Sequence, residues 1–179
     1  AITLIACTCY SLVLYRIERA EILSGIDNQL LTAANAVQEI VPDGYHERIR
    51  QRDSIPSAEF DALQDRLSRF SNASGLAYSY TYMQFGPEIR TVSTSATVAE
   101  MRTGSQTPFF TLYDTAPAKL RRSFADGRIG FDEYSDSFGR FRSIYKPIRM
   151  RDGRTYVVGA DVDLGQLDAK LRTALMQSI

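Results

Sequence analysis

The chain has 179 residues, and its 21 basic and 21 acidic side chains give a formal net charge of zero. This length fits one globular domain with a substantial core, and 44% hydrophobic residues exclude a disordered or fibrous chain. The charges are balanced and form no block of one sign, which excludes the usual electrostatic surface for nucleic acid. We therefore expect no nucleic-acid partner.

Residues 1–15, AITLIACTCYSLVLY, contain no charged side chain. Since roughly 20 apolar residues are needed to cross a bilayer, we interpret this run as the outer end of a longer transmembrane segment. A cleaved signal peptide is one alternative, although it would have a basic start and a small-residue cleavage site. A lipoprotein is another, because LIAC at residues 4–7 is similar to a lipid-attachment box that would modify Cys7.

Both cysteines, Cys7 and Cys9, lie in this first run. A remainder without thiols avoids accidental disulfides in an oxidising compartment, so it favours a periplasmic or extracellular location. Two cysteines and one distant histidine, His46, do not supply the roughly four ligands of a structural zinc site. We expect neither a metal nor a cofactor.

Residues 16–41 predict an amphipathic helix, because apolar side chains recur at alternating steps of about three and four residues. The turn VPDG at residues 41–44 ends it. This apolar stripe can pack on the core of its own domain, form a seam in a parallel homodimer, or do both. It consists of Leu23, Ile26, Leu30, Ala33, Val37 and Ile40. A second helix is predicted after Pro56 and ends before the turn at residues 72–75.

Residues 76–85 alternate and are rich in aromatic and β-branched side chains, which predicts a strand, and a second strand follows over residues 89–95. Residues 96–113 have no clear period, so we expect a long connection there. A helix is predicted up to Gly127, because glycine is favoured just after a helix C-terminus.

Three strand-like runs at residues 129–136, 139–148 and 155–164 are separated by short glycine turns, as in antiparallel hairpins. The last residues predict a helix, and residues 172–179 would lead toward a second membrane span. The element order predicts an α+β fold. It would have a five-stranded antiparallel sheet, a long N-terminal helix, and helices on one side that leave the other side polar.

With these elements in place, the segments YSYTYMQFG, YDTAPAKLRRSF, YSDSFGRFRSIYKPI and DGRTYVVGADVDL resemble single-Cache domains, which are PAS-like extracytoplasmic sensors of bacterial receptors. The resemblance covers residues 16–171. It implies a non-enzymatic, ligand-sensing input domain in the periplasm, anchored in the inner membrane. The first expectation for the absent cytoplasmic part is a histidine kinase, and a chemoreceptor, a cyclic-dinucleotide enzyme or a lipid-anchored solute-binding protein is the alternative.

One departure from this family concerns amino-acid ligands. Amino-acid-sensing members carry an arginine and a tryptophan before a Tyr-x-x-Ala element, and they use a later aspartate as well. Here Tyr113 and Ala116 match that element and Asp161 resembles the aspartate, but Phe110 and Leu112 replace the other two residues. An amino-acid ligand is therefore not expected.

The candidate ligand site consists of Tyr113, Arg142, Ser143, Tyr145 and Asp161. An even-numbered loop at RDG would put Arg142 and Asp161 on one face of the sheet, and an odd-numbered loop would put them on opposite faces. On one face, Arg142 could bind a small carboxylate in bidentate fashion. The alternatives are a solvated ion pair, or an empty pocket that signals through a partner protein.

Three tyrosines at residues 78, 80 and 82 share a strand face, where they could build core or line a pocket. An extracytoplasmic hydrolase is the enzymatic alternative, but His46 has no serine or cysteine motif beside it. We expect His46 to lie at the surface. The carboxylates of Asp132, Glu133 and Asp136 are interpreted as solvated strand positions.

Overall fold

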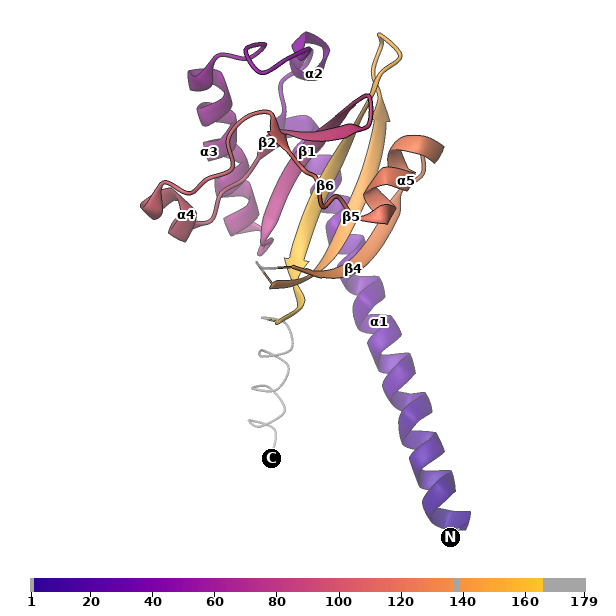
Figure 1. Ribbon diagram of the computed structural model, residues 1–179. Coiled ribbons are helices and arrows are strands. Elements are labelled where there is room, and N and C mark those ends of the chain that lie inside the picture. The colour runs from indigo at the N-terminus through magenta and orange to yellow at the C-terminus, as the bar shows by residue number, and fades with distance from the viewer. Residues whose placement is uncertain (1, 137–138, 166–179) are drawn as a thin grey trace.

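The computed structural model describes residues 2–136 and 139–165, which form helices around one sheet (Figure 1). The helices are α1 (Ile2–Ile40), α2 (Tyr45–Arg48), α3 (Ser57–Ala73), α4 (Val98–Thr103) and α5 (Ala118–Asp126). The strands are β1 (Tyr78–Phe85), β2 (Glu88–Thr94), β3 (Thr111–Leu112), β4 (Gly130–Asp136), β5 (Gly139–Arg149) and β6 (Thr155–Asp163). The predicted α+β class is confirmed, and the predicted last helix lies outside the described residues.

The sheet has six strands in the order β3-β2-β1-β6-β5-β4, and all neighbouring strands are antiparallel. Five of these strands were predicted. The sixth, β3, is a two-residue edge strand within the connection that has no sequence period, so the expected strand number was one too low. Because the first and last long strands, β1 and β6, pair in the centre, the sheet brings residues far apart in the chain side by side.

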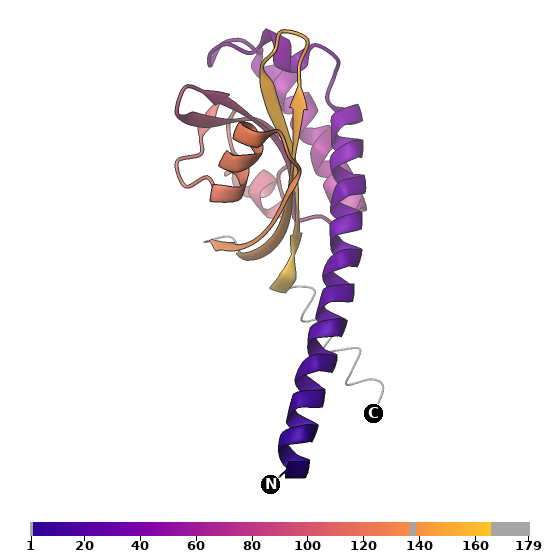
Figure 2. The same cartoon turned by 90° about the vertical axis from the view of Figure 1, so that its right-hand side faces the viewer.

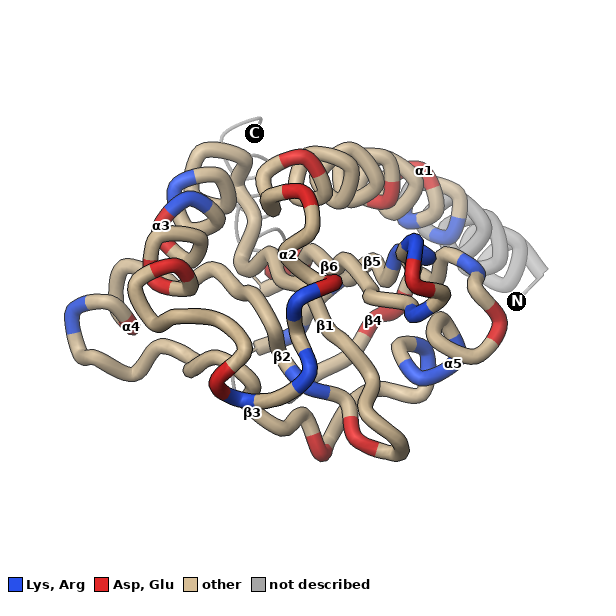
Figure 3. The backbone as a smooth tube through the Cα atoms, turned by 90° about the horizontal axis from the view of Figure 1, so that it is seen from above, with Lys and Arg blue, Asp and Glu red and all other residues tan. Residues whose placement is uncertain are grey.

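Both faces of the sheet are covered (Figure 2). Helices α1 and α3 lie along one face, and α5 and the connection between β2 and α5 lie over the other, while α4 lies beside α3 at the edge of the sheet (Figure 3). The expectation of one polar, uncovered face was therefore wrong. Its physical reason is a second apolar cluster on that face, which includes the buried side chains of Tyr82, Leu120, Tyr145 and Val157.

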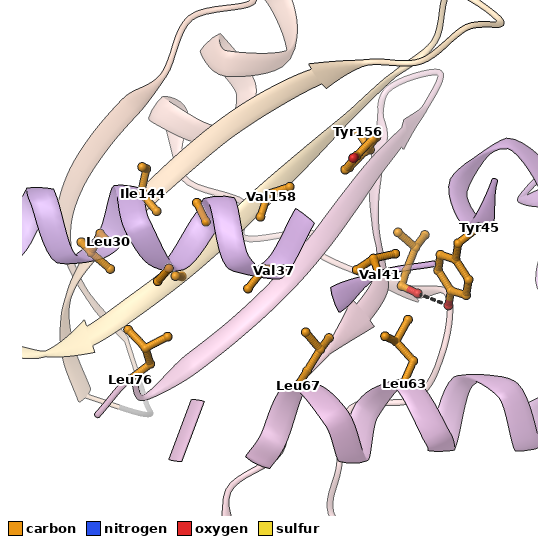
Figure 4. Packing of buried hydrophobic residues seen from close by; sticks show 14 of the residues in the cluster. Leu30, Val37, Val41, Tyr45, Leu63, Leu67, Leu76, Ile144, Tyr156 and Val158 are labelled. Carbon is orange, nitrogen blue, oxygen red and sulfur yellow. Dashed lines mark hydrogen bonds between the residues drawn. The ribbon is translucent and has the colours of Figure 1, made fainter. Parts of the chain in front are cut away.

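The main core lies between the sheet and the helices α1 and α3. Leu30 and Val37 of α1 are fully buried and point toward strand residues Ile144 and Val158 (Figure 4). Burial of each such aliphatic side chain stabilises the fold by about 1.5–3 kcal/mol. The α1 stripe therefore packs on the core of its own domain, which is one of the arrangements expected from the sequence.

Helix α1 is also held to β5 by charge. The guanidinium of Arg142 donates to both carboxylate oxygens of Asp27 at 2.8 and 2.7 Å. The helix continues without a break to Ile2. Over residues 2–136 and 139–165, we find no helix whose length and hydropathy suit a membrane span. The assignment of residues 1–15 to the end of a longer transmembrane segment stays a prediction.

His46 lies in α2 and is buried, with 3% of its surface exposed, so the expectation of a surface histidine was wrong. Its ring stacks on Tyr156 with ring centroids 3.7 Å apart, and Nε2 lies 3.0 Å from the hydroxyl of Thr81. The short helix α2 places this ring in the core. The charged residues around His46 in the sequence do not reveal this tertiary effect. Burial lowers the pKa of His46 from 6.5 to about 3.

We expect this burial to make the fold sensitive to acid. Below the unfolded pKa of 6.5, the unfolded chain binds a proton that the folded His46, with a pKa of about 3, does not bind. Stability is therefore full above the unfolded pKa and falls with pH, by about 2 kcal/mol between about pH 7.5 and about pH 5. Urea unfolding followed by circular dichroism at both pH values measures this loss.

The control is His46→Gln, which removes the only histidine of the chain. It lowers stability at every pH, since packing is lost, but the difference between the two pH values should shrink markedly. An unchanged difference in the variant would show that another group is responsible.

Candidate ligand-binding site

A cavity of about 190 Å³ lies on the face of the sheet that α1 and α3 do not cover. Two larger grooves, of about 770 and 590 Å³, lie elsewhere on the described structure. We take the smaller cavity as the candidate site, because it combines aromatic rings with a buried carboxylate. Its lining is Tyr78, Tyr80, Tyr82, Thr91, Thr94, Glu100, Thr107, Thr111, Leu112, Tyr113, Tyr134, Phe141 and Asp161.

Asp161 of β6 is the charged residue at the floor of this cavity, and only 3% of its surface is exposed. Its carboxylate accepts hydrogen bonds from the hydroxyls of Tyr80 at 2.6 Å, Ser143 at 2.5 Å and Tyr134 at 3.5 Å. A buried carboxylate is costly without such donors. The three strands β1, β5 and β4 each supply one of them, so the sheet itself builds the floor.

Gly159 makes the bond between Tyr80 and Asp161 sterically accessible. It pairs with Tyr80 across β1 and β6, and a Cβ atom at residue 159 would lie 1.9 Å from Cε2 of the Tyr80 ring. Any larger residue would therefore displace this ring. Glycine in the middle of a strand is unfavourable by itself, and here it marks a close approach of a side chain to the backbone.

Aromatic rings form the walls of the cavity. The ring of Tyr82 lies 4.7 Å from that of Tyr80 and 5.2 Å from that of Tyr113, in a stacked arrangement with the second. On the other side, Tyr134 and Phe141 have ring centroids 5.7 Å apart. Burial raises the pKa of Tyr80 and Tyr82 well above the ordinary value, and Asp161 raises both further. Their hydroxyls therefore stay protonated near neutral pH.

Of the predicted site residues, Tyr113 and Asp161 line the cavity, and Ser143 donates to Asp161. Tyr145 is fully buried on the same face, but it is not part of the lining. Arg142 lies on the opposite face, with Asp27 of α1.

The reason is the register of β5 and β6. Arg149 pairs with Thr155, so the loop has five residues, and Ser143 stands opposite Asp161. The odd-numbered alternative therefore holds, and Arg142 and Asp161 point to opposite faces.

The sequence interpretation missed Glu100 and Tyr134, which also line the cavity. Thr97 and Glu100 form a capping box at the start of α4, a T-x-x-E signal that predicts a helix start but not its place in space. Within the described residues, no group of three His, Cys, Asp or Glu side chains is arranged to hold a metal ion.

The fold is similar to solved bacterial sensor domains. The ligand-binding domain of the Campylobacter jejuni chemoreceptor Tlp3, in complex with 4-methylisoleucine, matches with a TM-score of 0.50 and 15% identity over 79% of this chain and 52% of that one. The ligand-binding domain of the Pseudomonas aeruginosa amino-acid chemoreceptor PctC, in complex with GABA, has a TM-score of 0.48 and 16% identity over 84% and 60%. The sensor domain of the Vibrio cholerae histidine kinase DctB has a TM-score of 0.47 and 16% identity over 80% and 57%.

This chain thus spans little more than half of each of these structures. The similarity to the Tlp3 domain confirms the predicted α+β fold. Comparisons with protein-family models and with curated sequences find no match.

Two tyrosine substitutions test the floor of the cavity. Tyr80→Phe removes a donor to a buried carboxylate and should lower the free energy of unfolding by about 1–3 kcal/mol. Tyr145→Phe removes a buried hydroxyl that has no hydrogen-bond partner within the described structure, so it should leave stability unchanged or slightly higher. Urea unfolding monitored by circular dichroism compares the two variants, and equal losses would contradict this assignment.

Proposed function

We propose that this chain is the extracytoplasmic ligand-sensing input domain of a bacterial transmembrane receptor, and that its cavity binds a small organic cation. The observation that carries the ligand class is the cavity lining, in which both charged residues, Asp161 and Glu100, are acidic. An ammonium group beside a carboxylate and against tyrosine faces gains both ion-pair and cation–π stabilisation. The fold supports the sensing role, and we propose no catalytic role for this domain.

A carboxylate ligand bound by Arg142 is the alternative that the sequence predicted. The geometry argues against it, because Arg142 faces α1 and its guanidinium is already bonded to Asp27 in bidentate fashion. Movement of this side chain to the cavity would require it to leave Asp27 and cross the sheet. An organic cation requires no such rearrangement.

The proposal also includes the location of the domain and its output. Helix α1 extends away from the sheet, and β6 ends at the same pole from which α1 extends (Figure 1). This arrangement suits a periplasmic domain held to the inner membrane by residues 1–15 and by residues 172–179. We propose a cytoplasmic histidine kinase as the output, with a chemoreceptor or a cyclic-dinucleotide enzyme as the alternative.

A homodimer is part of this proposal. Since Ile26, Leu30 and Val37 are buried in the domain itself, the contact between copies would use the outer face of α1, on which Asn28 and Thr32 are exposed.

We expect cysteines at Asn28 and Thr32 to form crosslinks in the membrane-bound receptor, with Cys7 and Cys9 replaced by serine. The matched control is Ala62→Cys, which lies on the exposed side of α3. Crosslinking is measured by non-reducing electrophoresis after mild oxidation. Crosslinks at Ala62 alone, or at none of the three residues, would reject the α1 contact.

A thermal-shift screen of amines, organic acids, amino acids and sugars tests the proposed ligand class. An amine at about 100 times its Kd should raise Tm by roughly 5–10 °C. This shift should be lost in Asp161→Asn and reduced in Tyr113→Ala, which removes a wall ring but no buried charge. It should persist in Arg142→Gln, which keeps a donor for Asp27. Stabilisation by an acid that is lost in Arg142→Gln would instead support the carboxylate alternative.

A further inference from the structure

Helix α4 covers the cavity with a second carboxylate. Glu100 in its first turn lines the cavity and accepts a hydrogen bond from the hydroxyl of Tyr78 at 3.2 Å. Its other oxygen accepts from the backbone N–H and the hydroxyl of Thr97 at 2.7 and 2.8 Å. A carboxylate can accept about four hydrogen bonds, so the Glu100 side chain can also receive a donor from the cavity.

The two carboxylates of the cavity lining come from different elements, Asp161 from β6 and Glu100 from α4. Tyr78 stands directly opposite Asp161 in the pairing of β1 and β6, and its side chain extends from the strand to Glu100. Asp161 is therefore the strand partner of Tyr78, and Glu100 lies at the hydroxyl end of the same tyrosine side chain. Tyrosine rings line the space between them.

The volume of the cavity suits a small ligand. Its volume of about 190 Å³ equals that of roughly six water molecules at about 30 Å³ each. A short aliphatic chain fits such a volume, which is below the roughly 300 Å³ of a typical site for a drug-sized molecule.

Helix α4 is itself loosely held. None of its residues is buried, and Val98 and Met101 are 68% and 40% exposed. A segment with few buried contacts opens at low cost in free energy. Glu100 is thus carried by an element that can move toward a ligand, while Asp161 is fixed in the centre of the sheet.

We propose that the ligand is a short dication of the diamine class, with one ammonium group on Asp161 and the other on Glu100, and that α4 closes over it. This inference rests on the proposed function, because it concerns the same cavity. A monoamine would engage Asp161 and leave the Glu100 carboxylate without a cation, whereas a diamine engages both carboxylates. Glu100 then determines the specificity for the second amino group.

The test combines two ligands with protein variants and measures Kd by isothermal titration calorimetry on the whole 179-residue chain. The probes are putrescine, which has an amino group at each end of a butyl chain, and n-butylamine, which has one. The variant is Glu100→Gln, because glutamine also forms a capping box with Thr97 and so preserves α4. Asp126→Asn is the control, since it removes the same charge from the exposed end of α5.

Putrescine should bind the wild type at least about tenfold more tightly than n-butylamine, as expected for an added charge-assisted contact. Glu100→Gln should weaken putrescine binding by about tenfold and change n-butylamine binding by less than about twofold. Asp126→Asn should affect neither ligand, and Asp161→Asn should weaken both.

Equal effects of Glu100→Gln on both amines, or no effect on putrescine, would overturn the role of Glu100. Stabilisation of the domain by a monoamine or an acid but not by putrescine would overturn the diamine class and leave the sensing role intact. The absence of binding by every class of small molecule would overturn both proposals.

Discussion

The buried carboxylate of Asp161 determines which side chains the neighbouring strands must have around it. A charge in the middle of a sheet is costly unless donors surround it, and here tyrosine and serine hydroxyls from β1, β5 and β4 supply them. The ring of Tyr80 reaches the carboxylate only because residue 159 has no side chain. One charge thus explains a glycine in the central strand, a serine in β5, and the tyrosines that line the cavity.

The strand β5 connects this charge to helix α1. Neighbouring residues on a strand point to opposite faces, so Ser143 contacts Asp161 while Arg142 contacts Asp27 of α1. A displacement of β5 at the floor of the cavity therefore acts directly on the ion pair that holds α1. Any such effect is limited by the difference in ligand affinity between the two arrangements of the sheet and helix.

Local sequence patterns predicted those elements that have a clear apolar period or a glycine turn. The apolar period of α1 and the glycine turns of the last three strands indicated a helix and two hairpins, and both are present. The edge strand β3 and the position of α4 could not be predicted, because residues 96–113 owe their placement to contacts with β2 and Tyr78 rather than to a period.

The site was predicted only in part, because the placement of its side chains also depends on tertiary contacts. Asp161 and Tyr113 were identified, but the face of Arg142 depends on whether the preceding loop has an odd or even length, which the letters RDG do not fix. His46 lies in a charged segment, and only the tertiary structure buries it.

Strand β1 carries polar networks on both faces, and together they fix its register. Tyr80 donates to Asp161 on the cavity side, while the hydroxyl of Thr81 lies 3.0 Å from His46 and 2.6 Å from Ser93 on the helix side. A slip by one residue would exchange the two faces and leave Asp161 and His46 without these partners at the same time. Hydrophobic contacts alone discriminate weakly between registers when both faces are buried, because apolar side chains are acceptable on either one. The two buried polar groups thus help to specify the register, and the cavity side of β1 cannot be altered without an effect on the side that packs against α3 and α1.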